Sequence, residues 1–515
     1  MLAAFLLDDL ISHEHGHESL GAPPQAGTMA WYSLVLMTSL LFPLLVLLVM
    51  RCYVTRSGAK LLDKLPSVPG RLPVIGHLHL IGSLPHISLR NLATKHSPDM
   101  MLLHLGALPT LVVSSSRVAQ SILHTHDDIF ASRPYSPIAN ILFYGATDVG
   151  FSPYNEYWWQ IKKITTTHLL TVKKVRSYVS ARQREVRIVI ARITEAASKH
   201  EKEGWNQLLR KLVKVNTSLL GGFNIEDYFP SFTRLAAVRR LLLSCAKAHN
   251  INKRWDQLLE KLIDDHTTKH IRSSSMLNHY DEEAGFIDVL LSIQHEYGLT
   301  KDNIKANLAA MLMAGTDTSF IELEYAMAEL MQKPHVMGKL QAEVRRVMPK
   351  GQDIVTEEQL GCMPYLKAVI KETLRLYPPA PLLMPHLSMS DCNINGYTIP
   401  SGTRVIVNVW ALARDSNYWE NADEFIPERF IVNTLGDYNG NNFHFLSFGS
   451  GRRIYPGINF AIATIEIMLA NLVYRFDWEL PADQAAKGGI DMTETFGVAV
   501  HRKEKLLLIP HLHLR

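Results

Sequence analysis

The chain has 515 residues, of which 47% are hydrophobic and 20% are charged, so it can bury a large folded core. Its 53 basic and 49 acidic residues give a net charge of +4, and we therefore expect no nucleic-acid partner. Four cysteines without metal-type spacing are too few for a disulfide scaffold, which excludes a disulfide-rich secreted protein.

An apolar segment near the N-terminus predicts a transmembrane anchor. Residues 31–50 are dense in Leu, Val, Met and Phe, and no charged residue occurs between Ser19 and Met50. Twenty residues at a rise of about 1.5 Å each match the thickness of a bilayer's hydrocarbon core. Basic residues such as Arg51 and Arg56 follow the span, so we expect the rest of the chain on the cytosolic side. A buried helix of a soluble core is the alternative interpretation.

The segments around this span suggest the remaining organisation. Residues 1–28 form an N-terminal extension, whose histidine-rich run at 13–17 is interpreted as a solvated tail. Residues 51–73 are basic and rich in proline, which indicates a stiff hinge. Residues 74–515 show no internal repeat and no second shift in composition, which predicts one large domain.

Apolar periodicity predicts the elements of that domain. Short apolar runs at 110–113 and 404–410 predict strands. Longer segments with helical periodicity at 303–331, 365–376 and 458–476 predict helices. The fold class is therefore mainly α with a small β portion.

Two local patterns suggest chemistry on physical grounds. The loop Phe448–Gly457 contains glycines that let the backbone pass close to a flat ligand, although phosphate-binding loops look partly similar. Glu372 and Arg375 stand at i and i+3 on one face of a helix. A lone pair of that kind is usually a weak surface ion pair.

The glycine-containing loop resembles the haem-binding loop of the cytochrome P-450 superfamily. Phe448, Gly451, Arg453 and Gly457 match its fixed positions, and Tyr455 stands where the family has a cysteine. The resemblance implies that residue 455 is the axial metal ligand of haem and that Arg453 holds a haem propionate. A phenolate ligand is the arrangement found in catalase, whereas a thiolate favours cleavage of the O–O bond.

A segment of the long predicted helix resembles the family's oxygen-binding motif. It reads Ala-Gly-Thr-Asp-Thr-Ser and contains Gly315, Asp317 and Thr318. The resemblance implies that Gly315 lets this helix approach the haem and that Asp317 and Thr318 are catalytic residues that relay protons to dioxygen.

Two further motifs agree with the same family. Glu372 and Arg375, together with Arg429 further along the chain, resemble the triad that locks the haem-binding core. Trp158 and Lys162 resemble the Trp-x-x-x-Arg segment that binds a haem propionate, with lysine in place of arginine. Lysine keeps the positive charge but loses the planar fork of donors.

The resemblance implies a function and a location. The chain is expected to be a monooxygenase of plant secondary metabolism with haem b as cofactor, electrons from NADPH through a reductase, and a small lipophilic substrate. It implies a single-pass protein of the endoplasmic reticulum membrane with a cytosolic catalytic domain. Segments 72–77 and 130–134 resemble the plant microsomal enzymes, nearest to the grass clade of indole and indolinone hydroxylases.

Two departures from the family pattern define an alternative. Tyr455 replaces the cysteine, and the region near residues 196–204 is shorter than in the family by about one helix. The alternative is a catalytically impaired member, either a pseudoenzyme or a damaged gene product. Cys362 and Cys392 are expected to be buried structural thiols and not metal ligands, because neither lies in the loop.

Overall fold

The computed structural model describes residues 39, 59–196, 206–222, 224–229, 243–273, 285–349, 351–432, 438–486 and 489–513. The chain divides into two units, Met1–Arg56 and Ser57–Arg515. The predicted extension and, apart from Ser39, the predicted anchor lie outside the described residues, as does most of the shortened region near 196–204. The description below concerns the second unit.

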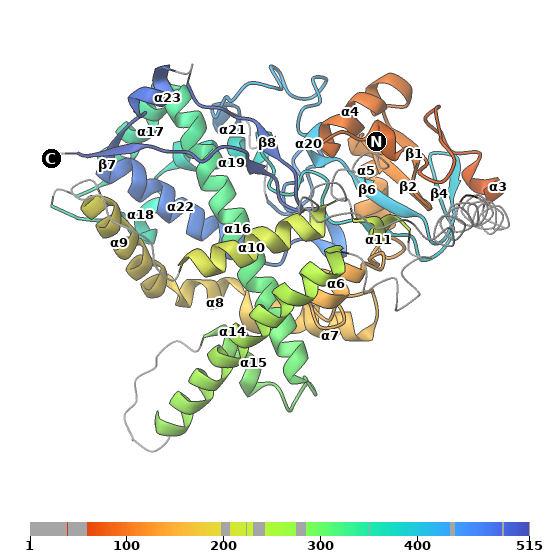
Figure 1. Cartoon of the computed structure of the whole chain (residues 1–515). Helices are drawn as coiled ribbons and strands as arrows, with labels where there is room; N and C mark the ends of the chain where they lie inside the picture. Colours follow the sequence, from red (N-terminus) through yellow and green to blue (C-terminus); the bar gives the residue numbers. More distant parts are fainter. Residues whose placement is uncertain are drawn as a thin grey trace, which may run out of the picture. The chain divides into compact units, whose positions relative to one another are not determined.

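Helices make up most of this unit (Figure 1). Their bounds are α3 Ala59–Leu62, α4 Pro85–His96, α5 Ser116–Gln120, α6 Pro137–Leu142, α7 Glu156–Ile164, α8 Val172–Ser177, α9 Val179–Ala196, α10 Asn206–Gly221, α11 Ile225–Tyr228, α14 Leu243–Ser273, α15 Phe286–Ser292, α16 Lys301–Gln332, α17 Pro334–Val347, α18 Glu357–Leu360, α19 Pro364–Leu376, α20 Val409–Leu412, α21 Arg429–Val432, α22 Ile458–Arg475 and α23 Ala482–Ala486. Short 3-10 or π-helical turns are η1 Leu78–Leu80, η2 Ser121–Thr125, η3 Thr165–Leu169 and η4 Gly451–Arg453.

The strands form one four-stranded sheet and three two-stranded ones within the described residues. The strands are β1 Met100–Leu105, β2 Leu108–Val113, β3 His386–Leu387, β4 Cys392–Ile394, β5 Tyr397–Ile399, β6 Arg404–Val407, β7 Phe476–Glu479, β8 Glu494–Thr495, β9 His501–Arg502 and β10 Ile509–Leu512. The larger sheet has the order β1-β2-β6-β3, and β2 pairs in parallel with β6 in the register Thr110↔Arg404. The predicted mainly helical fold with a small β portion is confirmed.

The predicted elements agree with the structure except at one strand end. The three predicted helices correspond to α16, α19 and α22. The strand predicted over 404–410 ends at Val407, because Asn408 caps a new helix by accepting a hydrogen bond from the Ala411 N–H at 3.1 Å. Val409 and Trp410 are apolar because they are buried in α20, not because they continue the strand.

The long helix α16 organises the core of the unit (Figure 1). It begins with a capping box, in which Thr300 and Asn303 satisfy each other's backbone N–H groups. It packs against α19 and α22 on one side and against α10 and α14 on another. A helix that is buried on several faces is apolar nearly all round, so the apolar residues of α16 do not form a single stripe along one face. Residues in its middle are thereby held at the centre of the fold.

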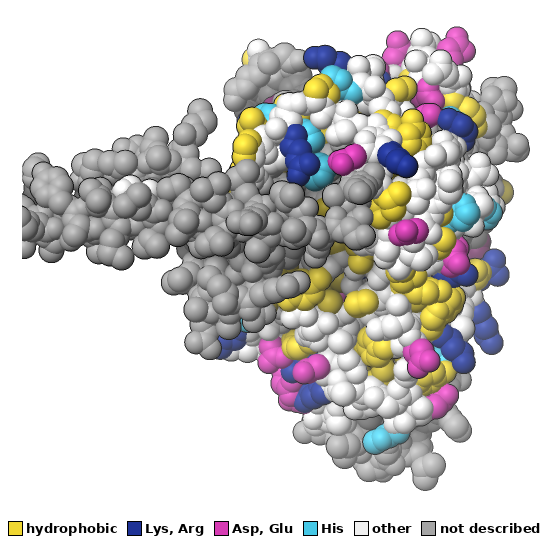
Figure 2. Space-filling view, turned by 90° about the vertical axis from the view of Figure 1, so that its right-hand side faces the viewer, with side chains coloured by type: hydrophobic (Ala, Val, Ile, Leu, Met, Phe, Trp, Pro, Cys, Tyr) yellow, Lys and Arg dark blue, Asp and Glu magenta, His cyan; other side chains and the backbone are white. Residues whose placement is uncertain are grey.

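One described helix, α22, is long and apolar enough to cross a membrane by length and composition. Its residues Ile465, Leu469 and Val473 are buried in the same hydrophobic core as α17 and α19. Acidic and basic side chains are interspersed over the described part of the face seen in Figure 2, as the nearly equal numbers of both signs lead one to expect.

Candidate active site

A cavity of about 290 Å³ lies between α16, the loop Phe448–Gly457, and the loop that precedes β9. All residues that the motifs placed around a cofactor line this cavity, with the exception of Gly451. They are Trp158, Lys162, Gly315, Asp317, Thr318, Phe448, Arg453, Tyr455 and Gly457. Gly451 has a φ of +66°, and a Cβ there would lie 2.0 Å from the Leu123 carbonyl oxygen, so this glycine serves the packing of the loop against η2.

The α16 wall of the cavity combines open space with two polar side chains. A Cβ built on Gly315 meets no atom within 4 Å, so the backbone here faces the open cavity. One turn along, the Thr318 hydroxyl donates a 2.6 Å hydrogen bond to the Ala314 carbonyl. Asp317 accepts hydrogen bonds from the Thr217 hydroxyl at 2.9 Å and from His501 at 3.0 Å. The two residues predicted to be catalytic therefore face the same cavity.

Arg453 and Trp158 form the opposite rim. The Arg453 guanidinium carbon lies 4.2 Å from the centroid of the Trp158 ring, which is a cation–π contact. Its nitrogens donate to the backbone carbonyls of Ala131 at 2.6 Å, Val149 at 3.3 Å and Ser152 at 2.6 Å. These carbonyls orient the guanidinium but do not neutralise its charge.

Two more cations and one carboxylate share this rim. Lys162 donates a 3.3 Å hydrogen bond to the carbonyl of Ile454. Arg133, which sequence reasoning did not select, is buried and donates to the carbonyls of Gly150, Met384 and Pro385. Asp148 is also buried, and its Oδ1 accepts from the N–H groups of Gly150 and Phe151. Its Oδ2 has no hydrogen-bond partner within the described part of the chain.

The rim therefore carries a surplus of positive charge. Burial lowers the pKa of Lys162 to about 8 and that of Arg133 to about 10. Burial, with a contribution from Arg133, lowers the pKa of Arg453 to about 8. Burial also raises the pKa of Asp148 to about 6. Three cations face one carboxylate, so a ligand with two carboxylates would balance them.

Glu322 is a further cavity residue that sequence reasoning missed. Its side chain is fully buried, and neither carboxyl oxygen has a hydrogen-bond partner among the described residues. Burial raises its pKa well above the usual range, which favours the protonated, uncharged form. It lies one turn beyond Thr318 on α16.

Tyr455 is part of the cavity lining. Its hydroxyl lies near the Thr318 side chain on α16, and burial raises its pKa to about 12, so the phenol is neutral. The ring stacks on Phe448 with centroids 6.0 Å apart. A Cβ on Gly457 would lie 2.8 Å from a Tyr455 ring carbon, so the ring can stand here only beside a glycine. Tyr455 thus bridges the loop and α16.

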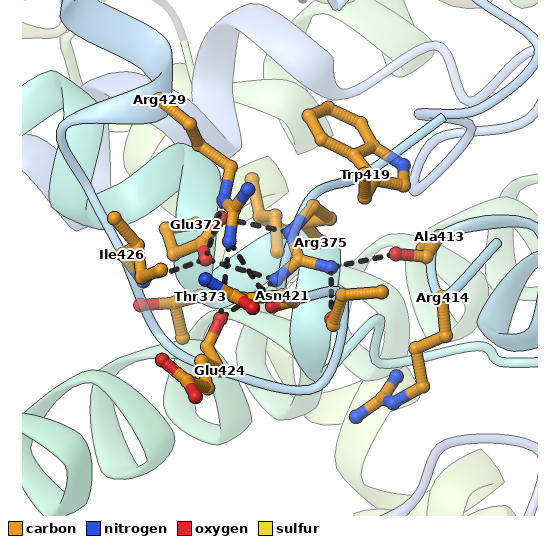
Figure 3. A network of polar contacts seen from close by, with 12 residues as sticks. Glu372, Thr373, Arg375, Ala413, Arg414, Trp419, Asn421, Glu424, Ile426 and Arg429 are labelled. Carbon is orange, nitrogen blue, oxygen red and sulfur yellow. Dashed lines mark hydrogen bonds and ion pairs between the residues drawn. The ribbon is translucent and has the colours of Figure 1, made fainter. Parts of the chain in front are cut away.

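The residues Glu372, Arg375 and Arg429 lie away from the cavity and form a buried network (Figure 3). Both Glu372 oxygens accept from Arg375, at 2.8 and 2.9 Å, and Oε1 also accepts from Arg429 at 3.0 Å. Arg375 donates further to the backbone carbonyls of Ala413 and Ala422. The network ties α19 to the segment that precedes the cavity loop.

Comparison with known proteins identifies the family. The sequence profile of the family described as Cytochrome P-450 matches residues 66–509. The chain belongs to the cytochrome P-450 family.

Several similar relatives come from maize, Zea mays. Indole-2-monooxygenase is 52% identical over 88% of this chain and 88% of its own length. Indolin-2-one monooxygenase is 48% identical, covering 87% and 89% of the two chains, and 3-hydroxyindolin-2-one monooxygenase is 47% identical, covering 87% and 88%. A zebra fish cytochrome P-450 structure with abiraterone superposes with a TM-score of 0.64 over 84% of this chain and 100% of that one, at 22% identity, which shows the shared fold.

Membership in the cytochrome P-450 family settles the enzyme class. The chain is an oxidoreductase of the class that incorporates molecular oxygen, and the family uses haem with electrons from NADPH through a reductase. The cationic rim fits the two propionates of haem, and the open space before Gly315 fits a flat ring close to α16. Tyr455 lines the same cavity as these groups.

The structure also corrects one expectation and explains several omissions. Cys392 is buried as expected, but Cys362 is exposed, because it follows the short helix α18 at the surface. Neither cysteine lines the cavity. Arg133 lies in a segment that resembled the plant enzymes, so a signal existed for it. Thr217 and His501 had none, because only the folded chain brings them to Asp317.

Proposed function

We propose that this cavity hydroxylates small, flat, apolar substrates of the indole type and that Tyr455 weakens the reaction in this chain. The observation that carries the proposal is a mostly apolar cavity that is lined by Asp317 and Thr318 and also by the cationic rim. The substrate class is supported by the names of three relatives at 47 to 52% identity, which are monooxygenases of indole and indolinones.

The residues Arg133, Lys162 and Arg453 would hold the haem carboxylates. Arginine and lysine beside carboxylates form charge-assisted hydrogen bonds, which are among the strongest polar contacts in proteins. Trp158 keeps Arg453 in position through the cation–π contact. When bound, haem supplies the redox chemistry that places one oxygen atom of O₂ in a C–H bond.

Asp317 and Thr318 on α16 would transfer protons. Asp317 reaches the cavity beside Thr318, and an acid next to a hydroxyl is a suitable pair for moving a proton to a bound oxygen species. Gly315 leaves the space in which substrate and oxygen meet this pair. The apolar wall, which includes Phe143, Phe151 and Met313, keeps water away from the reacting groups.

Tyr455 is the residue in the position of the iron ligand. A phenol with a pKa near 12 must lose its proton to bind a metal well, whereas a thiol ionises more readily. The tyrosine ring is also bulkier than a cysteine side chain, and overpacking of this kind costs about 1–3 kcal/mol. We therefore expect haem to be held weakly and without a thiolate bond.

A second candidate function, that of a catalytically impaired family member, is favoured by the Tyr455 ring inside the cavity. A shortened region near 196–204 is part of the same proposal. It is supported by the polar run of residues 197–204, which has the composition of a loop or of a join between two segments.

The proposal includes a location. Residues 1–28 are an extension, 31–50 a single membrane anchor, 51–73 the hinge, and 74–515 the catalytic domain on the cytosolic side of the endoplasmic reticulum. It is supported by the uncharged segment of residues 19–50, followed by basic residues. Fusing a glycosylation reporter to the C-terminus tests it: the reporter should stay unglycosylated in membrane fractions.

The experiment that tests the function compares the unmodified chain with Tyr455→Cys and, as control, Tyr455→Phe. We expect a thiolate-type carbon monoxide difference spectrum in Tyr455→Cys alone, and faster NADPH-dependent hydroxylation of indole or indolin-2-one in Tyr455→Cys than in the unmodified chain. A thiolate-type spectrum in the unmodified chain would contradict the role of Tyr455. If Tyr455→Cys gives the spectrum but converts neither compound, the substrate class is wrong. If it binds no haem, the shortened region is decisive.

A further inference from the structure

His501 lies outside every motif, yet it contacts the cavity acid Asp317. Its Nε2 is 3.0 Å from Asp317 Oδ2, and the Thr217 hydroxyl donates to the same oxygen at 2.9 Å. Within the described residues, Oδ1 of Asp317 has no hydrogen bond. One oxygen of the acid is therefore held by two side chains, of which Thr217 also lines the cavity, while the other oxygen has no hydrogen bond among the described residues.

The three residues come from elements far apart in sequence. Thr217 is on α10, Asp317 on α16 and His501 on β9. The side chains of Asp317 and His501 are 11% and 19% exposed, and Thr217 is buried. A largely buried carboxylate needs a partner, and His501 is the basic side chain within ion-pair distance of Asp317 in the described part of the chain.

The loop before His501 packs closely on α10 at the same place. The Val498 N–H donates to the Thr217 carbonyl at 3.0 Å, and the Val500 N–H donates to the Pro379 carbonyl at 2.9 Å. A Cβ on Gly221 would lie 1.9 Å from the Val498 nitrogen, so no side chain fits between α10 and the loop. Val498 itself lines the cavity. Thr217 therefore contacts both Asp317, through its hydroxyl, and this loop, through its carbonyl.

The neighbouring charges already have other partners. Arg502, the next residue after His501, lies 3.7 Å from Glu324 and donates to the Asp491 carbonyl at 2.7 Å. Glu324 also accepts from the Leu506 N–H at 3.2 Å. Of these neighbouring residues, His501 is the one that pairs with Asp317.

We propose that His501 is the positioning residue of Asp317. By holding Oδ2 together with Thr217, it fixes the direction in which Oδ1 meets the cavity and keeps the loop at 497–501 against α10. The consequence for turnover rests on the proposed role of Asp317 as a proton carrier. An acid that swings away from Thr318 delivers protons poorly, so electrons from NADPH leave as hydrogen peroxide instead of forming hydroxylated product.

The first test needs no cofactor. Hydrogen exchange of the full chain is measured by mass spectrometry for His501→Phe, which keeps a ring but loses the donor, and for His501→Gln, which keeps a donor. We expect about tenfold faster exchange at the amides of Val498 and Val500 in His501→Phe, since a local contact is lost, and near-normal exchange in His501→Gln. The α19 peptide is the internal control. Equal exchange in the two variants would overturn the proposal.

A double-mutant cycle with Asp317→Asn separates positioning from general packing. If His501 acts through Asp317, His501→Phe should change exchange in the Asp317→Asn background by less than about twofold, because coupled neighbours are not additive. A full tenfold effect in that background would show that the ring acts independently of Asp317.

The second test uses the Tyr455→Cys background with reductase, and measures hydroxylated product against hydrogen peroxide per NADPH. His501→Phe should lower the product fraction about tenfold, and His501→Gln should restore it, as for other residues that orient a catalytic group. If exchange responds as expected but the product fraction does not, His501 still positions Asp317, and the proposed proton role of Asp317 is what fails.

Discussion

Glu372 and Glu322 are both fully buried acids, on α19 and α16, yet their surroundings are opposite. Glu372 accepts hydrogen bonds from two arginines and from the Ile426 N–H, whereas neither oxygen of Glu322 has a partner among the described residues. The first belongs to a network in which two arginines surround the carboxylate and more than balance its charge. The second lines the cavity, where it and Asp148 Oδ2 have no hydrogen-bond partner among the described residues. The contrast distinguishes polar groups that stabilise the fold from polar groups that belong to a ligand site.

The sharpest way to break the network is to remove its carboxylate. Glu372→Ala leaves the fully buried Arg375 without an anion, and breaking a buried pair in this way costs about 3–5 kcal/mol. Chemical unfolding monitored by circular dichroism measures the loss. A cost below about 0.5 kcal/mol, typical of surface substitutions, would mean that the triad does not hold the core.

Substitutions at the cavity rim should lower the affinity for a ligand more than they lower the stability of the fold. Lys162→Met removes one of three cations, and a hydrogen bond to a charged group is worth about 1.5–3 kcal/mol, so affinity for metal-free protoporphyrin should fall about 10- to 100-fold. Its dimethyl ester is the control, because it lacks the two negative charges. Both probes avoid the iron ligand. Equal losses for the acid and the ester would show that charge is not what the rim recognises.

Removing the unsatisfied acid should stabilise the protein. Glu322→Leu deletes a buried group without partners, for which the penalty is about 1–3 kcal/mol, so unfolding at pH 7 should require more denaturant. Because burial raises the pKa of Glu322, its contribution to stability falls as the pH rises above the unfolded value near 4.5. The variant should lose that part of the pH dependence. A destabilised Glu322→Leu chain would mean that the acid has a partner after all.

The smallest effect is expected at an exposed pair. Lys339 lies 2.7 Å from Glu428, but their side chains are 56% and 39% exposed. Exposed ion pairs contribute about 0–1 kcal/mol, so Lys339→Ala should change the unfolding free energy by less than 1 kcal/mol. It is the matched control for Glu372→Ala, since both changes remove one member of an ion pair.

The sequence predicted the parts of the site that are local in the chain. Glu372 and Arg375 are three residues apart on one helix, and Asp317 and Thr318 are adjacent, so a short motif contains each pair. Thr217 and His501 could not be selected in the same way, because their partner Asp317 lies on another element. Asp148 was missed for a different reason, since its partners are the nearby backbone N–H groups of Gly150 and Phe151, which form no motif. Burial is likewise a property of the assembled fold, which is why Glu322 looked like an ordinary polar position of α16.

The fold was predictable to the same extent. Periodicity located α16, α19 and α22, because each contributes apolar residues to the core at helical spacing. It failed at residues 408–410, where a single capping side chain, that of Asn408, ends β6 and starts α20. An apolar run alone does not distinguish a strand from a short buried helix, since both are filled with the same residue types.

The parallel pairing of β2 with β6 has a consequence for synthesis. Thr110 pairs with Arg404, so the β1–β2 hairpin leaves the ribosome long before its neighbour in the sheet exists. At about 5–20 residues per second, the ribosome needs roughly 15 to 60 s to add the residues between them. During that interval the edge of β2, with the apolar residues Leu111, Val112 and Val113, is open to pairing with other chains. Nascent chains stalled before Arg404 should therefore bind chaperones strongly, and those that have passed Val407 should release them.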